Sequence, residues 1–260
     1  MNLAPRFLAV VLACILAACA SAPPTPTEVR VMTSGGFTAA FKQLVPQFER
    51  ATGHKVVAAY GASQGGAPDS IPSRLARGEP VDVVILAAPA LEGLIKEGKV
   101  APGSRVDLVH SKIGIVVKAG APRPDISTLD AFRRTVLAAK SLAYSASASG
   151  VYLSTELFPK MGIWEQIRGK SQRIESARVA TVVAKGDAEI GFQQVSELLE
   201  IGGVDFVGVL PEGAQRVTTF SAGMGATAKQ PEVARQLVRF FKSAEAEPII
   251  RKSGLEPARP

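Results

Sequence analysis

Hydrophobic and polar positions change their spacing several times along the chain. A β-rich run, 29–32, ends at a glycine-containing turn, 33–36, after which large apolar residues recur at helical spacing across 37–48. This pattern predicts a strand, a tight turn and a helix. Pro46 lies inside the helical pattern and predicts a kink, and Gly53 is placed to end the helix.

The next segments repeat this alternation of strand and helix. A second strand is predicted at 56–60, and a glycine-rich loop, 61–66, follows it. The run 81–86 is continuously apolar, which favours a strand buried on both faces of a parallel sheet, and 89–97 fits a crossover helix. Ligands of such α/β sheets usually meet the loops at the carboxyl ends of the strands, where 33–36 and 61–66 lie.

A second set of units begins near the middle of the chain, and a strand and an amphipathic helix close it. The predicted elements are a β-rich segment at 106–118, a helix opening at 127–130, a strand at 141–144, helices at 151–161 and 179–185, strands at 188–193 and 217–220, and a helix at 231–242. We therefore expect an α/β fold of two lobes, each a mostly parallel sheet flanked by helices. The first lobe is predicted to contain 28–108 plus 218–260, and the second 109–217.

The N-terminus has the pattern of an export signal. Arg6 precedes an apolar run, 7–18, which is too short to span a bilayer comfortably, and a Pro-rich stretch follows. We predict a signal peptide at 1–19 and an extended tether at 20–27.

Two cleavage sites compete within this leader. The run 16–19 resembles the lipobox of bacterial lipoproteins, whereas 20–22 would serve an ordinary signal peptidase. The lipobox is the favoured alternative, and a lipid on Cys19 would hold the protein at a membrane surface without a spanning helix. The simpler alternative is a disordered leader that is removed.

The composition removes several classes of chemistry. Cys14 and Cys19 both lie in the leader, so the folded part has no disulfide, no thiol nucleophile and no cysteine metal ligand. His54 and His110 have no spacing that indicates a metal pair, so neither a metal site nor a cofactor is expected.

The charge is moderately basic, with 30 Lys and Arg against 23 Asp and Glu and a formal net charge of +7. This balance weakly favours anionic partners. The cations are scattered and are not interleaved with aromatic residues, so solvated surface charge is the better interpretation and nucleic-acid binding is not expected.

Six segments, in this order, carry a resemblance to a known family over almost the whole chain that follows the leader. They are 31–41, 46–53, 75–85, 150–152, 185–191 and 254–257. They resemble the periplasmic type II solute-binding family, and within it the molybdate-binding branch of the ABC transporter substrate-binding proteins. The resemblance implies two lobes joined by crossing strands, with a ligand held in the cleft and lobe closure signalling occupancy.

The resemblance also implies where the first lobe would contact a ligand. The first contact loop falls on Ser34, Gly35 and Gly36, where the family's usual ligand serine aligns with Gly36 and Ser34 is a displaced candidate. The second contact falls on Ser63, which keeps the hydroxyl. Glycine turns and helix N-termini suit an anion because they present unpaired N–H donors and a positive dipole end.

In the second lobe, the resemblance points to three further contacts. The serine-rich turn 145–150 offers Ser147 and Ser149, a backbone contact falls near Val179, and Gln194 replaces the family's usual tyrosine. Because two hydroxyl positions are altered, the ligand is either a tetrahedral oxyanion such as molybdate or tungstate or a small organic acid. A glutamine amide suits a carboxylate as well as an oxyanion.

The expected function is capture of this small anion outside the cytoplasm, in the periplasm, by a monomer that delivers it to an inner-membrane ABC permease. No enzymatic activity is expected. A lipid-tethered sensor that reports to a membrane receptor is a second hypothesis, and a periplasmic serine hydrolase is a third. The hydrolase hypothesis rests on the Gly-x-Ser-x-Gly pattern at 61–65, with His110 as the only histidine downstream of Ser63.

Each candidate also has a purely structural interpretation. The turn at 34–36 could serve only to join a strand to a helix, and Ser147 and Ser149 could be helix-capping residues. Tyr60 and Tyr152 are predicted to be packing residues. Arg178 is either a counter-charge in the cleft or a solvated side chain, and the solvated side chain is the favoured interpretation.

Overall fold

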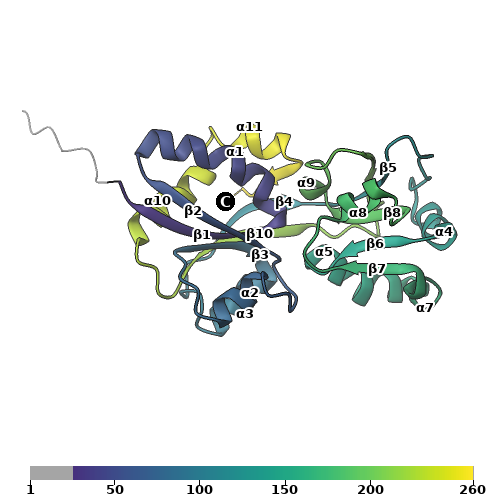
Figure 1. The fold of residues 1–260 in the computed structure, drawn as a ribbon, viewed down its shortest axis with the longest axis horizontal. Coiled ribbons are helices and arrows are strands. Elements are labelled where there is room, and N and C mark those ends of the chain that lie inside the picture. The colour runs from purple at the N-terminus through teal and green to yellow at the C-terminus, as the bar shows by residue number, and fades with distance from the viewer. Residues whose placement is uncertain (1–25, 260) are drawn as a thin grey trace, which may run out of the picture.

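The computed structural model describes residues 26–259, which form two lobes side by side, each built on its own β-sheet (Figure 1). The expected two-lobed α/β architecture is confirmed. The predicted signal peptide, most of the tether and Cys19 lie outside the described residues. No helix within 26–259 is long and apolar enough to cross a membrane.

Lobe 1 is the six-stranded sheet and its helices, with strand order β11-β4-β10-β3-β1-β2. Its strands are β1 (Glu28–Ser34), β2 (Lys55–Gly61), β3 (Val83–Ala87), β4 (Val106–Ser111), β10 (Thr218–Met224) and β11 (Leu255–Pro257), and its helices are α1 (Gly35–Thr52), α2 (Ile71–Ala76), α3 (Ala88–Lys96), α10 (Pro231–Phe241) and α11 (Glu247–Lys252).

Lobe 2 is the five-stranded sheet and its helices, with strand order β7-β6-β8-β5-β9. Its strands are β5 (Ile113–Lys118), β6 (Leu142–Ser145), β7 (Ser171–Ile174), β8 (Ile190–Gln194) and β9 (Val204–Val209), and its α-helices are α4 (Leu129–Ala138), α5 (Ala148–Tyr152), α6 (Phe158–Lys160), α7 (Trp164–Ile167), α8 (Val179–Lys185) and α9 (Val195–Leu198). The segment 153–157 between α5 and α6 is a π-helical turn, so the helix predicted at 151–161 is a continuous helical segment over 148–160 with this turn inside it.

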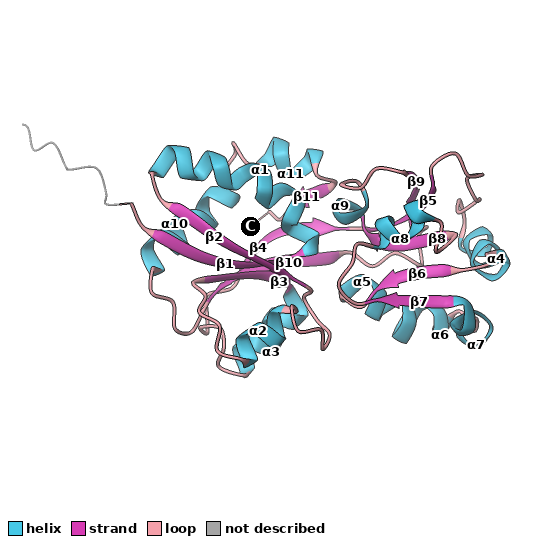
Figure 2. Cartoon of the chain, in the orientation of Figure 1, coloured by secondary structure: helices cyan, strands magenta, loops and turns pink. Residues whose placement is uncertain are grey.

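Both sheets are mixed. In lobe 1, β1 runs parallel to β2 and β3, whereas β10 runs antiparallel to β3 and β4. In lobe 2, β6 runs parallel to β7 and β8, whereas β5 runs antiparallel to β8 and β9. The antiparallel neighbours arise because β4 passes directly into β5, and β9 returns the chain to β10, so these strands carry the chain between the lobes (Figure 2).

The β-rich segment predicted at 106–118 is therefore two strands in different sheets, separated by Lys112. The proposed lobe boundaries remain a prediction, and residues 109–111, which they assign to the second lobe, pair within the lobe 1 sheet.

Helix α1 is placed by an aromatic core. Phe37, Phe41 and Phe48 on its inner face are buried, and Phe37 meets Phe241 of α10 edge-on at a ring separation of 5.3 Å. Burying large aromatic side chains is among the strongest contributions to folding. The helix begins directly at Gly35, without the separate turn predicted there, and Gly53 ends it in the left-handed conformation. Pro46 lies within the continuous helix.

Candidate functional site

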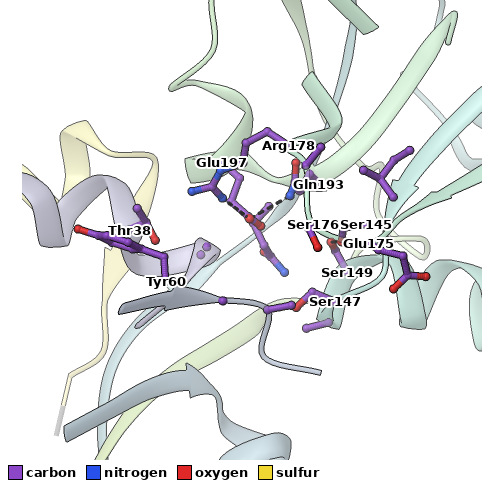
Figure 3. Close-up of a pocket in the computed structure, with 18 of the residues that line it drawn as sticks. Thr38, Tyr60, Ser145, Ser147, Ser149, Glu175, Ser176, Arg178, Gln193 and Glu197 are labelled. Atoms are coloured by element: carbon purple, nitrogen blue, oxygen red, sulfur yellow. Dashed lines mark hydrogen bonds and ion pairs between the residues drawn. The ribbon is translucent and has the colours of Figure 1, made fainter. Parts of the chain in front are cut away.

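A cavity of about 160 Å³ lies between the lobes (Figure 3). Lobe 1 contributes the start of α1, the end of β2 and the loop after it, and lobe 2 contributes the β6–α5 turn, the β7–α8 loop and the end of β8. The lining residues with polar side chains are Thr38, Tyr60, Asp69, Ser145, Ser147, Ser149, Glu175, Ser176, Arg178, Gln193, Gln194 and Glu197.

The N-terminus of α1 provides hydrogen-bond donors at one end of this cavity. Gly35 and Gly36 line it, and no acidic residue lies in the first turn of the 18-residue helix. Ser34, directly before the helix, is buried, and its hydroxyl has no hydrogen-bond partner within 26–259. Unpaired first-turn N–H groups and the positive end of the helix dipole favour a bound anion.

Gly36 occupies the position where the family resemblance implies a ligand serine, and Phe220 fills the space beside it. A Cβ atom built on Gly36 would lie 2.1 Å from Cζ of the Phe220 ring, which is buried at 2% exposure. A hydroxyl-bearing side chain therefore does not fit here unless the ring moves. The loss of this hydroxyl distinguishes the cavity from the site that the resemblance implies.

Ser63 and Ser147 form a direct contact between the lobes. The Ser63 hydroxyl accepts a hydrogen bond from the Ala87 backbone N–H at 3.0 Å, and the Ser63 N–H donates to the Ser147 hydroxyl at 3.2 Å. Ser147 lines the cavity, whereas Ser63 is fully buried behind it. The side chain of Ser63 thus holds its loop against the end of β3.

The serine hydrolase hypothesis receives no support from this geometry. His110, the proposed base, makes its hydrogen bond with the Thr219 hydroxyl at 3.1 Å, not with Ser63. A nucleophilic serine needs a base within hydrogen-bond reach.

The serine turn of lobe 2 places a second hydroxyl pair at the cavity. Ser145 and Ser149 are buried, line the cavity and lie 3.2 Å apart through their hydroxyl oxygens. Gly150 permits this tight turn, because a Cβ there would lie 1.7 Å from the Ser145 carbonyl oxygen. The sequence indicated the turn 145–150 and singled out Ser147 and Ser149 in it, and the structure adds Ser145, whose hydroxyl lies beside that of Ser149.

Of the two predicted ligand contacts Val179 and Gln194, only Gln194 lines the cavity. The Val179 N–H donates to the Gln193 side-chain oxygen at 2.9 Å, and Val179 is not part of the cavity lining, so the backbone contact expected there is made within the protein. Gln194 does line the cavity. Its amide nitrogen donates to the Thr218 hydroxyl at 3.0 Å, and its buried oxygen has no partner within the described chain.

Arg178 is a cavity residue, contrary to the prediction of a solvated side chain. Its guanidinium donates to Glu197 at 2.5 Å and to Glu200 at 3.3 Å, and its side chain is 25% exposed. The Gln193 amide nitrogen donates to the same Glu197 oxygen at 2.9 Å. In Figure 3, Arg178 and Gln193 lie on either side of the Glu197 carboxylate.

Glu197 is the acidic group that sequence reasoning missed. Burial raises the pKa of its carboxyl above the ordinary value, although the charge of Arg178 acts in the opposite direction. Its partner Arg178 is 19 residues away in the sequence, so no local motif joins the two.

Tyr60 is also a cavity residue, with 43% of its surface exposed, although it was predicted to be a packing residue. Its ring meets Phe41 edge-on at 6.3 Å, so one side packs on α1 while the other faces the cavity. Tyr152, by contrast, packs within lobe 2, where its hydroxyl donates to the Ala214 carbonyl at 3.0 Å. Within 26–259, no cluster of three or more His, Cys, Asp or Glu side chains could hold a metal ion.

The fold and the inter-lobe cavity define a two-lobed binding protein. The family model of bacterial extracellular solute-binding proteins matches residues 29–256, and the chain belongs to this family. The resemblance to the molybdate-binding branch is confirmed by the molybdate-binding protein ModA of Azotobacter vinelandii, which is 30% identical over 265 residues, covering 95% of this chain and 96% of the relative. A solved periplasmic molybdate-binding protein of the same organism superposes with a TM-score of 0.71 at 21% identity, covering 89% of this chain and 99% of that one.

One similarity corrects the expectation that the chain performs no chemistry. The protein named aconitate isomerase from Pseudomonas sp. is 46% identical over 231 residues, which cover 89% of this chain and 88% of the relative. That relative is an enzyme, so the prediction of a protein without enzymatic activity is contradicted.

Proposed function

We propose that this protein binds a small unsaturated tricarboxylate of the aconitate type and interconverts its cis and trans isomers. The observation that carries the proposal is the 46% identity, across nearly the whole of both chains, to the aconitate isomerase of Pseudomonas sp.. The identity to the molybdate-binding relative is lower, at 30%.

The donors at the cavity support a carboxylate ligand. The α1 N-terminus offers N–H groups, the serine turn offers hydroxyls, and Arg178 offers a planar guanidinium that matches a carboxylate in shape. The cavity of about 160 Å³ is smaller than the roughly 300–1,000 Å³ of pockets for drug-sized molecules. It suits a ligand of few atoms.

The cavity lining contains both hydrogen-bond donors and carboxylates, which are the kinds of group that the reaction needs. In an aconitate skeleton, the CH₂ group lies beside both a C=C bond and a carboxylate, so removal of one of its protons gives a delocalised allylic anion. Returning a proton at the other end of that anion moves the double bond and can invert its geometry. Such a step requires one acid–base group and positive charge to stabilise the anion.

The test is incubation of the purified protein with trans-aconitate, followed by proton NMR. We expect cis-aconitate to appear until both isomers reach a constant ratio, with the same ratio approached from the cis side. A heat-inactivated sample is the control for spontaneous isomerisation. Tight binding of trans-aconitate without any conversion would overturn the proposed activity.

Transport is the second candidate function, supported by the family match and by the molybdate-binding relatives. In this proposal the protein is an extracytoplasmic monomer that delivers a small anion to an ABC permease, or reports it to a membrane receptor as a sensor. A thermal-shift screen would compare molybdate, tungstate and sulfate with small carboxylates, since a bound ligand raises the melting temperature. A selective shift with molybdate and tungstate would favour the oxyanion carrier.

We further propose that a lipid on Cys19 anchors the protein to a membrane. Cys19→Ser should release it into the soluble fraction after cell disruption, as the leader pattern around this residue predicts. Unchanged membrane retention of the variant would refute the lipid anchor.

A further inference from the structure

Glu197 is a buried carboxylate at the wall of the inter-lobe cavity. It sits in α9, directly after β8, and is 7% exposed. Both hydrogen bonds that it accepts end on the same oxygen, Oε1, from Arg178 at 2.5 Å and from Gln193 at 2.9 Å. The other oxygen, Oε2, accepts none within the described chain, and it is therefore available to a bound molecule.

The other two carboxylates that line this cavity, Asp69 and Glu175, are engaged in exposed contacts. Asp69 accepts a hydrogen bond from the exposed Ser176 hydroxyl at 3.2 Å, and Glu175 pairs with exposed Arg173 at 3.3 Å. A carboxylate surrounded by water is a weak base, whereas a buried one keeps a higher pKa. Burial raises the pKa of Glu197 accordingly.

The start of α1 packs against this carboxylate. A Cβ atom on Gly35 would lie 1.9 Å from Glu197 Oε1 and 2.5 Å from Arg178 Nη1, so only glycine lets the helix start approach so closely. The positive end of the α1 dipole and the Arg178 guanidinium thus flank the carboxylate. An anion that formed beside Oε2 would lie near both.

We propose that Glu197 is the group that moves the proton in the isomerisation, an inference that rests on the proposed aconitate isomerase function. Oε2 of the Glu197 carboxylate takes a proton from the substrate CH₂, and the C–H electron pair joins the C=C bond and its carboxylates as a delocalised anion. The protonated Glu197 then returns the proton to the carbon that had carried the double bond. One C–H bond breaks and one forms, no electron is transferred to another molecule, and the enzyme returns to its starting state.

The decisive variant is Glu197→Gln, which keeps the side chain's size and removes its basicity. We expect the isomerisation rate to fall by about 100-fold or more, the usual contribution of a general base, while trans-aconitate still binds with a Kd within about threefold of the wild type. The matched control is Glu156→Gln, which removes the same charge from an exposed Glu–Arg pair in lobe 2. Its rate should remain within about twofold of the wild type.

Incorporation of deuterium from solvent distinguishes two roles of Glu197, which are transfer of the proton and positioning of the Arg178 side chain. In D₂O, the acid proton of Glu197 exchanges with solvent in part of the turnovers before it is returned, so the wild-type protein should incorporate deuterium into aconitate recovered before equilibrium. Glu197→Gln should incorporate it at least about 100-fold more slowly. If Glu197 only positioned Arg178, the variant would bind weakly but would still exchange deuterium at a substrate concentration that saturates it. That result would overturn the proposal.

Glu197→Asp keeps the carboxylate and therefore its negative charge and its ability to pair with Arg178. This variant replaces Glu197→Gln in the test if the glutamine variant does not fold. We expect it to retain exchange at a reduced rate, because the carboxylate is set back by one methylene group. A wild-type rate in either variant would refute the role of Glu197 while leaving the proposed isomerase intact. A wild-type protein that binds aconitate without isomerising it would instead refute the proposed function itself.

Discussion

The backbone N–H of Ser63 in lobe 1 donates a hydrogen bond to the hydroxyl of Ser147 in lobe 2, over 3.2 Å. Further hydrogen bonds cross between the lobes, including the one from the Gln194 amide to the Thr218 hydroxyl at 3.0 Å. The Ser176 hydroxyl donates to the Asp69 carboxylate at 3.2 Å, and the Ser196 hydroxyl donates to the Gly36 carbonyl at 2.8 Å. The lobes are therefore bridged by several hydrogen bonds, as in the closed state of a hinged binding protein.

Removing the Ser147 hydroxyl should weaken ligand binding, because it costs a hydrogen bond of the bridged state. We expect Ser147→Ala to raise the Kd for trans-aconitate by about 2- to 10-fold, corresponding to the loss of one hydrogen bond. Isothermal titration calorimetry would measure the change. Ser154→Ala is the control, since the Ser154 hydroxyl bonds only within its own helical segment. An equal change in both variants, or none in Ser147→Ala, would contradict the role assigned to Ser147.

Restoring the serine that the family resemblance implies at position 36 should harm the protein. Gly36→Ser would push its side chain into the buried Phe220 ring, and overpacking of this kind costs about 1–3 kcal/mol of unfolding free energy. Urea denaturation would measure the loss. Gly93→Ala, in the interior of α3 with open space around its Cβ, should be neutral or stabilising by up to about 1 kcal/mol. A gain of molybdate binding by Gly36→Ser at unchanged stability would contradict this account.

Arg178 should not be replaceable by another cation. Arg178→Lys keeps the charge opposite Glu197 but loses the planar guanidinium fork, so we expect the Kd for trans-aconitate to rise by about tenfold or more. Arg216→Lys, in the exposed pair with Glu156, is the matched control and should leave the Kd unchanged. Wild-type affinity in Arg178→Lys would show that the guanidinium does not bind the substrate.

The isomerisation rate should rise with pH through the pKa of Glu197. Only the ionised carboxylate can take a proton, and burial raises the pKa of Glu197, against the opposing charge of Arg178 and with a further rise from nearby Glu200. The rate at saturating substrate should therefore fall as the pH is lowered, at a higher pH than an exposed glutamate would give. NMR analysis of samples quenched at several times, from about pH 4 to pH 9, would measure the dependence of the rate on pH. A rate that increases as the pH is lowered would contradict the role of Glu197 as the base.

The sequence by itself determined the class of fold. Apolar runs such as 81–86 and the helical spacing across 37–48 depend only on local periodicity, so strands and helices could be placed and their α/β order compared with a known family. The family resemblance also pointed to loops at the inter-lobe cavity, including those of Gly36, Ser147 and Gln194.

Tertiary structure alone decided the chemistry of that cavity. Arg178 lies directly before α8 and Glu197 lies in α9, and Phe220 of β10 fills the space beside Gly36. No local pattern records these contacts, because they depend on how segments distant in the sequence pack together within each lobe. The burial that raises the pKa of Glu197 is likewise a property of the packed cavity and not of the residue type. The sequence alone therefore indicated a binding protein and did not reveal a candidate acid–base group.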